Sequence, residues 1–235
     1  MAYTMNLVNM KTGESVWFDA HQARLGRMRR RIHAWSKAIS EVYRPYQTRL
    51  VMITLTYAEL DTWKPKHISE YMKRLRDKLD ENLLAYAWVG ETQERGAVHY
   101  HLYILVPAGT DVPKPDDSGM WVHGLSRIET GRSPFYMVTY VGKEYQKQGF
   151  PKGMRMFAVG IRKDAIPMYL MHRFKLSTLP RWLRAEVEKF GVLAMGLMPK
   201  PFPGGGWTLK IPADRNLWGM EDTETWFPSP WLIMR

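Results

Sequence analysis

The sequence contains no cysteine among its 235 residues. Disulfide bridges, zinc–thiolate sites and thiol catalysis are therefore excluded, and the composition is compatible with a reducing compartment. Long hydrophobic runs are also missing, since no apolar stretch approaches the ~20 residues that span a bilayer. The first residues lack the basic-then-apolar order of a signal peptide. We therefore expect an intracellular protein.

Acidic residues are outnumbered. Lys and Arg total 34 against 23 Asp and Glu, which gives a formal net charge of +11. A polyanionic partner such as a nucleic acid is the natural interpretation, because each neutralised phosphate releases counterions. Binding to a membrane surface and a merely solvated basic surface are the alternatives. Hydrophobic residues make up 45% of the chain, so a folded core is expected.

The chain divides into three expected parts: a basic helical arm over residues 1–45, a central domain over 46–165 and a C-terminal extension over 166–235, packed on that domain or tethered to it. In the arm, apolar residues recur at helical spacing, so one face can dock while the arginines face outward. The candidate phosphate-binding residues are Arg27, Arg29, Arg30 and Arg31, together with Lys147 further along the chain. A solvated charged face is the alternative.

In the central part, the spacing of apolar residues alternates between that of strands and that of helices. Apolar and β-branched runs predict strands, and three- and four-residue apolar steps predict amphipathic helices. The expected elements are strand 49–57, helix 65–79, strands 84–91 and 97–106, a weaker strand 120–129, helix 133–148 and strand 154–161. This order indicates an α+β fold: a central antiparallel sheet with packed helices, in a ferredoxin-like plan with one extra strand.

The last part of the sequence is harder to interpret. A helix is expected over residues 179–190, followed by a proline- and glycine-rich loop over 199–206. Four tryptophans follow without a clear period. They are interpreted as core or docking anchors, with stacking on nucleic-acid bases as the alternative.

Two histidines stand one residue apart on a predicted strand. His99 and His101 therefore point to the same face of the sheet, as metal ligands or as two hydrogen-bonded surface histidines. Glu91 ends the preceding strand, across a short turn, so it can lie beside them. Glu94 lies in the turn itself and is the other candidate carboxylate. Two imidazoles and one carboxylate suit a divalent ion such as Mg²⁺ or Mn²⁺.

Two tyrosines and a lysine recur on a predicted helix. Tyr136, Tyr140 and Lys143 are spaced by four and three residues, hence on one helical face. A phenol with its ordinary pKa of about 10 is a poor nucleophile at neutral pH. A metal ion on the phosphate and a nearby ammonium group would both favour its attack. The alternative is that both tyrosines are core residues.

These motifs, in this order, resemble those of a known family. They are the strand 53–57, the pair 90–91 followed by 99–101, and the helix segment 136–143. Together they are similar to rolling-circle replication initiators, the His-hydrophobic-His (HUH) endonucleases of small single-stranded DNA phages and bacterial plasmids. The resemblance covers about residues 49–162 and does not extend clearly to the arm or the tail.

The resemblance implies an enzyme that nicks and rejoins single-stranded or hairpin DNA at an origin. It would form a 5′-phosphotyrosine and a free 3′-hydroxyl in the cytoplasm of a bacterial host. His99, His101 and Glu91 would bind Mg²⁺ or Mn²⁺. No phosphate-binding loop is present in the sequence, so a separate host helicase is expected as a partner. No interaction with a membrane is expected.

The resemblance also implies roles on the helix. Tyr140 would be the principal nucleophile, Tyr136 the second tyrosine of a cutting-and-rejoining pair, and Lys143 would assist at the phosphate. Position 139 is Thr, where phage relatives often have Lys, and this departure leaves one- and two-tyrosine mechanisms both open.

Three alternatives remain at this stage. A transposase- or relaxase-like strand transferase shares the motifs, although relaxases place the tyrosine before the histidines. A non-catalytic nucleic-acid-binding protein could keep the fold. An Fe²⁺ oxygenase with two histidines and a carboxylate is disfavoured by the long helices and the basic charge.

Overall fold

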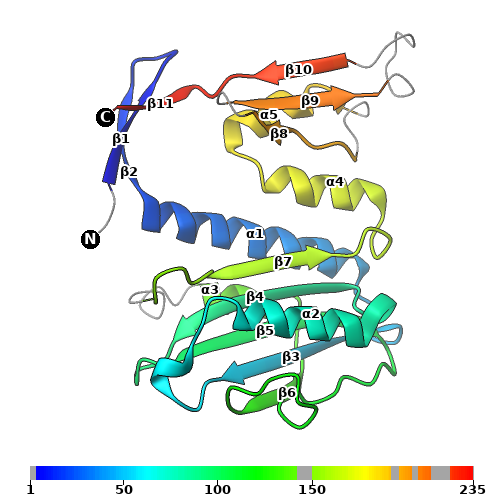
Figure 1. Cartoon of the computed structure of the whole chain (residues 1–235). Helices are drawn as coiled ribbons and strands as arrows, with labels where there is room; N and C mark the ends of the chain where they lie inside the picture. Colours follow the sequence, from blue (N-terminus) through cyan, green and yellow to red (C-terminus); the bar gives the residue numbers. More distant parts are fainter. Residues whose placement is uncertain (1–3, 142–149, 192–195, 203–205, 213–222, 235) are drawn as a thin grey trace. The chain divides into compact units, whose positions relative to one another are not determined.

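The structure is a computed structural model, and it describes residues 4–141, 150–191, 196–202, 206–212 and 223–234. Contacts divide the chain into two compact units (Figure 1). One unit runs from Arg31 to Ile166. The other combines Met1–Arg30 with Pro167–Arg235.

The unit Arg31–Ile166 is built on a five-stranded sheet with the order β6-β3-β5-β4-β7 (Figure 1). All four neighbouring pairs are antiparallel. The expected α+β fold with a central antiparallel sheet is therefore confirmed. The strands are β3 (Thr48–Thr56), β4 (Ala85–Thr92), β5 (Val98–Pro107), β6 (Ser126–Thr130) and β7 (Phe157–Ile161).

The order of elements along the chain is also the predicted one: β3, α2 (His67–Leu79), β4, β5, β6, α3 (Tyr136–Val141) and β7. Strand β5 lies between β3 and β4, so the β3-α2-β4 crossover passes over it, as in a ferredoxin-like sheet. Strand β7 adds the extra edge beside β4. The predicted helix 133–148 is seen as far as Val141, and its remainder lies outside the described residues.

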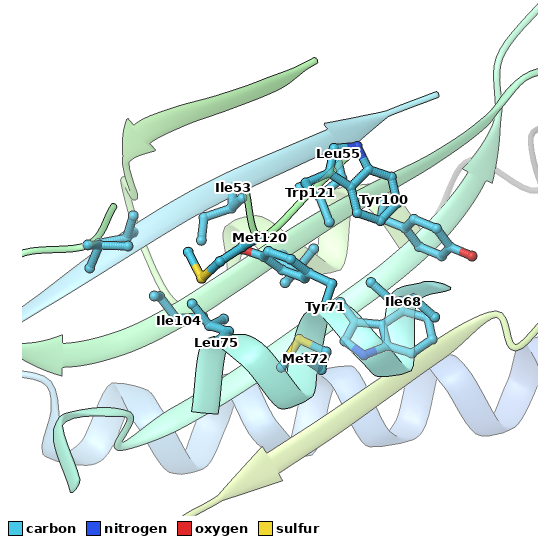
Figure 2. Close-up of a cluster of buried hydrophobic side chains, with 14 of the residues drawn as sticks. Ile53, Leu55, Ile68, Tyr71, Met72, Leu75, Tyr100, Ile104, Met120 and Trp121 are labelled. Atoms are coloured by element: carbon cyan, nitrogen blue, oxygen red, sulfur yellow. The ribbon is translucent and has the colours of Figure 1, made fainter. Parts of the chain in front are cut away.

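One face of the sheet is covered by helix α2 (Figure 2). Side chains on a strand alternate between faces, and an amphipathic helix buries one stripe. Both patterns meet in this core: β3 and β5 contribute every second residue, and α2 contributes the predicted stripe. Its buried members include Val51, Ile53, Leu55, Ile68, Met72, Leu75, Leu79, Tyr100, Leu102, Ile104 and Val106.

The opposite face of the sheet carries the alternate residues, among them the two histidines. The long helix α1 (Ala20–Val42) contributes Trp35, whose indole Nε1 donates a hydrogen bond to the carbonyl of Gly160 in β7 (3.3 Å). The helical spacing expected here is confirmed: Leu25, Met28, Ile32 and Trp35 are all at most 1% exposed.

The expected helical arm is correct for α1 but wrong for residues 4–19. That segment forms two antiparallel strands, β1 (Thr4–Asn9) and β2 (Ser15–Asp19). The physical reason is a tight turn that the helical interpretation overlooked. Gly13, at φ +72°, donates its N–H to the carbonyl of Asn9, and glycine adopts such a φ without steric cost.

The other unit contains two three-stranded sheets, β11-β1-β2 and β10-β9-β8. The predicted tail helix corresponds to α5 (Arg181–Glu188), which packs with β9 in a small apolar core. Trp207 packs against that core, as an anchor does, whereas Trp226 is 56% exposed. The remaining elements are α4 (Met168–Ser177), β8 (Lys200–Pro201), β9 (Trp207–Ile211), β10 (Thr223–Phe227) and β11 (Trp231–Met234).

None of the helices in the described residues combines the length and the apolar character that a membrane crossing requires.

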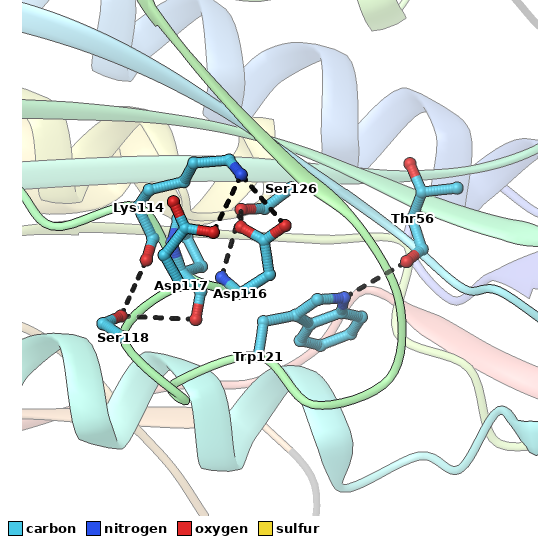
Figure 3. Close-up of polar contacts among 8 residues, drawn as sticks. Thr56, Lys114, Asp116, Asp117, Ser118, Trp121 and Ser126 are labelled. Carbon is cyan, nitrogen blue, oxygen red and sulfur yellow. Dashed lines mark hydrogen bonds and ion pairs between the residues drawn. The ribbon is translucent and has the colours of Figure 1, made fainter.

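The long connection between β5 and β6 is held in place by polar contacts (Figure 3). Lys114 pairs with Asp116 and Asp117 at 3.2 and 3.1 Å, and the Ser126 hydroxyl donates to Asp116. Desolvation acts against ionisation of Asp116, but hydrogen bonds from Ser126 and Lys114 lower its pKa to about 2. The connection therefore keeps a fixed path, which brings Trp121 into the α2-side core.

Gly124 lies where this connection meets the end of β3, and no side chain fits there. A Cβ at this position would lie 2.3 Å from the carbonyl oxygen of Thr56, at a φ of +155°. We predict that Gly124→Ala lowers the free energy of unfolding in urea by about 2 kcal/mol or more. Gly26→Ala is the control: its Cβ meets nothing closer than 3.4 Å, and a helical alanine should stabilise by about 0.5–1 kcal/mol. Equal stability of the two variants would contradict this assignment.

Candidate functional site

The register of the central strands brings the candidate metal ligands onto one face. His99 of β5 lies opposite Glu91 of β4, and His101 lies opposite Thr54 of β3. Residues directly opposite one another on antiparallel strands point to the same face. The imidazoles, the carboxylate and the Thr54 hydroxyl therefore share the face that does not carry α2.

Two of the three candidate ligands are in direct contact. The Nε2 atom of His101 lies 3.3 Å from the carboxylate of Glu91, and the two side chains are only 12% and 5% exposed. The rings of His99 and His101 are stacked, with centroids 4.5 Å apart and an interplanar angle of 23°. A buried carboxylate requires a compensating partner, and the neighbouring imidazole supplies it.

Polar side chains also contact the Nδ1 atoms of both rings. The hydroxyl of Thr54 lies 3.3 Å from Nδ1 of His101, and Nε2 of Gln93 lies 2.8 Å from Nδ1 of His99. Arg95 in turn donates from Nε to Oε1 of Gln93 (3.0 Å). Such contacts fix the orientation of the rings. In His101, the contact at Nδ1 leaves Nε2 facing the carboxylate.

The two tyrosines of α3 lie over the same face of the sheet. The ring of Tyr140 is 4.1 Å from that of His101, measured between centroids, and 5.6 Å from that of Tyr136. The hydroxyl of Tyr140 donates to the sulfur of Met52 (3.8 Å). Tyr136 is half-buried, and the guanidinium of Arg132 lies 5.8 Å from its ring. The predicted tyrosine pair is thus next to the histidine pair.

The surroundings of Tyr140 favour its neutral form. Burial raises the pKa of this phenol above its ordinary value, and a hydrogen bond with Tyr136 raises it further. The negative charge of Glu91 acts in the same direction. Ionisation of Tyr140 would therefore need a compensating positive charge brought to the site.

The donor set suits a hard or borderline divalent cation, since it offers two imidazoles and one carboxylate. In the part of the chain that the structure describes, no three His, Asp or Glu side chains already surround a common metal position. His101 and Glu91 are close enough to share one ion, and His99 stacks beside them. The residues therefore fit a metal after a local adjustment at His99.

The remaining predicted residues are not all brought to this face. Lys143 and Lys147 lie outside the described residues. On α1, Arg27, Arg29 and Arg30 are exposed, and Arg31 is half-buried. An exposed arginine face is what phosphate binding requires, and a solvated face would look the same.

Sequence reasoning missed four residues that contact the site: Thr54, Gln93, Arg95 and Arg132. Thr54 could have been found from the predicted strands, once strand 49–57 is aligned beside the histidine strand. Gln93 and Arg95 stand in the turn between the ligand strands, where the side-chain direction depends on the exact turn geometry. Nothing in the helical pattern indicates Arg132.

Comparison with known proteins gives one family match. Residues 50–148 match a family of replication-associated proteins, described as the replication-associated protein ORF2 family. This segment includes the candidate ligands His99, His101 and Glu91 and the tyrosine pair Tyr136 and Tyr140. A resemblance to replication-associated proteins is therefore supported over that segment.

The other comparisons add little. No curated protein matches the chain. Among solved structures, the hypothetical protein ORF119 from Sulfolobus islandicus rod-shaped virus 1 is 17% identical, over 54% of this chain and 97% of its own, with a TM-score of 0.29. That similarity is too low to inform the fold.

The environment of Tyr140 gives a spectroscopic prediction. Because its pKa is raised, its phenol should ionise only at a pH above the ordinary tyrosine pKa of about 10. The folded state holds this proton more tightly than the unfolded state, so the contribution to stability is lost as pH rises above about 10. NMR of the protein with tyrosine labelled at Cζ measures the pH at which each phenol ionises, and Tyr140→Phe identifies the signal of Tyr140. Ionisation of Tyr140 at or below about pH 10 would contradict the prediction.

Proposed function

We propose that this protein is a replication-associated endonuclease that nicks and rejoins single-stranded DNA through a tyrosine. The observation that carries the proposal is the contact between Tyr140 and His101, with ring centroids 4.1 Å apart, within the segment that matches the replication-associated family. A phenol beside an imidazole–carboxylate pair has the parts that phosphoryl transfer to tyrosine needs.

In the proposed reaction, the phenolic oxygen of Tyr140 attacks a phosphorus of the DNA backbone. The bond from phosphorus to the 3′-oxygen breaks as the bond to tyrosine forms, and the proton of the phenol ends on the released 3′-hydroxyl. A phosphodiester is exchanged for a phosphotyrosine, so no nucleotide cofactor is needed for the reverse step. Before attack, the Tyr140 hydroxyl must leave its contact with Met52.

Metal binding is assigned in this proposal to His101, Glu91 and His99, with Mg²⁺ or Mn²⁺ as the ion. When bound, the ion would polarise the phosphate and supply positive charge near the phenol. The protein's own part is to orient the imidazoles through Thr54 and Gln93. A cation at this position would also offset the effects that raise the pKa of Tyr140.

The second tyrosine has a distinct setting. Tyr136 is less buried than Tyr140, and its ring is contacted by Arg132. An arginine beside the tyrosine pair is suited to binding a phosphate oxygen. We assign Tyr136 and Lys143 supporting roles, rejoining and phosphate binding respectively, with Tyr140 as the nucleophile. A separate helicase would supply the single strand.

A non-catalytic nucleic-acid-binding protein is the second candidate function. It is favoured by the present burial of Tyr140, which is 7% exposed. A substrate phosphate could reach this hydroxyl only after α3 or its side chains shift. The two candidates differ in whether a covalent product forms.

The nucleophile is tested with matched tyrosine variants. Circular single-stranded DNA and Mn²⁺ should give a covalent adduct with the wild-type protein, seen as a shifted band on a denaturing gel. Tyr140→Phe should reduce the adduct by about 10³-fold or more, because the nucleophile itself is lost, while DNA affinity stays within about twofold.

Tyr136→Phe is the control for that experiment, and it should retain adduct formation because Tyr140 remains. An adduct that persists in Tyr140→Phe and disappears in Tyr136→Phe would exchange the two roles. Absence of any adduct from the wild type, with DNA binding intact, would favour the non-catalytic candidate.

The charged face of α1 gives a salt-dependence prediction. Arg27→Ala with Arg30→Ala should lower the slope of log affinity against log salt for single strands by about 1.4, because each lost phosphate contact contributes about 0.7. Lys73→Ala with Lys78→Ala is the control, since it removes equal charge from exposed positions on α2. Fluorescence anisotropy at several salt concentrations measures both slopes. Equal changes in the two double variants would contradict a binding role specific to α1.

A further inference from the structure

We propose that Gln93 is a positioning residue that sets the tautomer of His99, and that Arg95 fixes the orientation of Gln93. This inference rests on the proposed function, in which His99 is a metal ligand. It concerns two residues of the β4–β5 turn that do not themselves belong to the donor set. Their contacts form a short chain from the backbone to the imidazole.

The chain consists of three hydrogen bonds. Arg95 donates from Nη2 to the carbonyl of Tyr57 (2.7 Å), which anchors the guanidinium at the end of β3. Its Nε donates to Oε1 of Gln93 (3.0 Å). Nε2 of Gln93 then lies 2.8 Å from Nδ1 of His99. Each member of the chain thus restricts the next.

Donor and acceptor chemistry fixes the direction of these bonds. A guanidinium has only donors, so the atom of the Gln93 amide that faces Arg95 must be the oxygen. The amide nitrogen therefore faces His99, and an amide nitrogen also only donates. Nδ1 of His99 must accept. In a neutral imidazole that accepts at Nδ1, the single proton is on Nε2.

This tautomer opposes metal binding through Nε2, since a ligating nitrogen must present a lone pair. Binding there requires the proton to move to Nδ1, and the Gln93 amide must turn so that its oxygen accepts that proton. The turned amide would direct its NH₂ group at Nε of Arg95, donor against donor. Arg95 therefore holds Gln93 in the orientation that keeps His99 unready for the ion.

His101 has no such restriction at its Nδ1 atom. Its Nδ1 contacts the hydroxyl of Thr54 at 3.3 Å, and a hydroxyl can either donate or accept. Its Nε2, however, faces the carboxylate of Glu91 at 3.3 Å, and a carboxylate only accepts, so metal-free His101 also carries its proton on Nε2. When an ion takes the place of that proton, the Thr54 hydroxyl can accept from Nδ1 of His101. Opposition to the change of tautomer is thus confined to His99, where Gln93 and Arg95 supply it.

A glutamate at position 93 would favour the other tautomer of His99. Its carboxylate can accept from Nε of Arg95 and from Nδ1 of His99 at once, which leaves Nε2 with a lone pair. Gln93→Glu should therefore convert His99 to the Nδ1–H tautomer. Arg95→Met, which releases the amide, should give a mixture of the two tautomers.

The experiment uses the full chain labelled with ¹⁵N-histidine, metal-free, at about pH 8, which is above the ordinary imidazole pKa of about 6.5. Long-range ¹H–¹⁵N correlation distinguishes the tautomers, and His99→Gln assigns the signal. We expect Nε2–H in the wild type, Nδ1–H in Gln93→Glu and a mixture in Arg95→Met. The Nδ1–H form in the wild type, or the same tautomer in all three proteins, would overturn the inference.

Mn²⁺ titration followed by electron paramagnetic resonance supplies the second readout. Gln93→Glu should bind Mn²⁺ about tenfold more tightly than the wild type. Glu94→Gln, in the same turn, measures what one unit of charge contributes there. A gain from Gln93→Glu no larger than the loss from Glu94→Gln would overturn the role of the tautomer in metal affinity.

The two proposals can fail separately. If neither the wild type nor Gln93→Glu binds Mn²⁺ more tightly than His101→Ala does, the proposed metal site is wrong. The tautomer shift measured without metal would still decide the assignment of Gln93 and Arg95.

Discussion

The pairing of β4 with β5 in a single register is the constraint on which the site depends. Glu91 lies opposite His99 because the two strands are joined by a short turn with a fixed length. Side chains alternate along a strand, so a slip of one residue would move both histidines into the α2-side core. It would also expose Tyr100 and Leu102, which are at most 1% exposed. The apolar core thus fixes the position of the polar site.

The polar groups on the other face carry an electrostatic cost that the fold only partly offsets. Glu91 is 4% exposed and lies beside an imidazole, while burial keeps the neighbouring phenol of Tyr140 protonated. A site with a buried carboxylate and a neutral phenol is prepared to accept positive charge. A divalent ion would supply that charge, and Arg132 lies beside the ring of Tyr136. The proposed DNA nicking and the proposed metal binding therefore depend on the same local charges.

Much of the central unit could be predicted from the sequence, because its elements have strong periodicity. The strands around His99 and Glu91, the stripe of α2 and the neighbourhood of Tyr140 all follow from alternation and helical spacing. The hairpin at residues 4–19 was missed because a turn at Gly13 interrupts a segment with a weak pattern. The sheets of the C-terminal part were missed for a similar reason: their strands are short and interrupted by prolines and glycines.

The side-chain contacts within the site could not be predicted from the sequence. The contact of the Tyr140 hydroxyl with Met52 and the chain from Arg95 to His99 both depend on side-chain rotamers. Rotamers follow from packing in three dimensions and leave no periodic trace in the sequence.

The central claim is that His99, His101 and Glu91 hold one divalent ion beside Tyr140. Anomalous diffraction from crystals grown with Mn²⁺ and a short single-stranded oligonucleotide tests it directly. The account predicts one strong anomalous peak within bonding distance of the three side chains, with a backbone phosphate between the ion and the Tyr140 hydroxyl. A peak bound elsewhere, with Glu91 still paired to His101 as in the metal-free protein, would contradict the account.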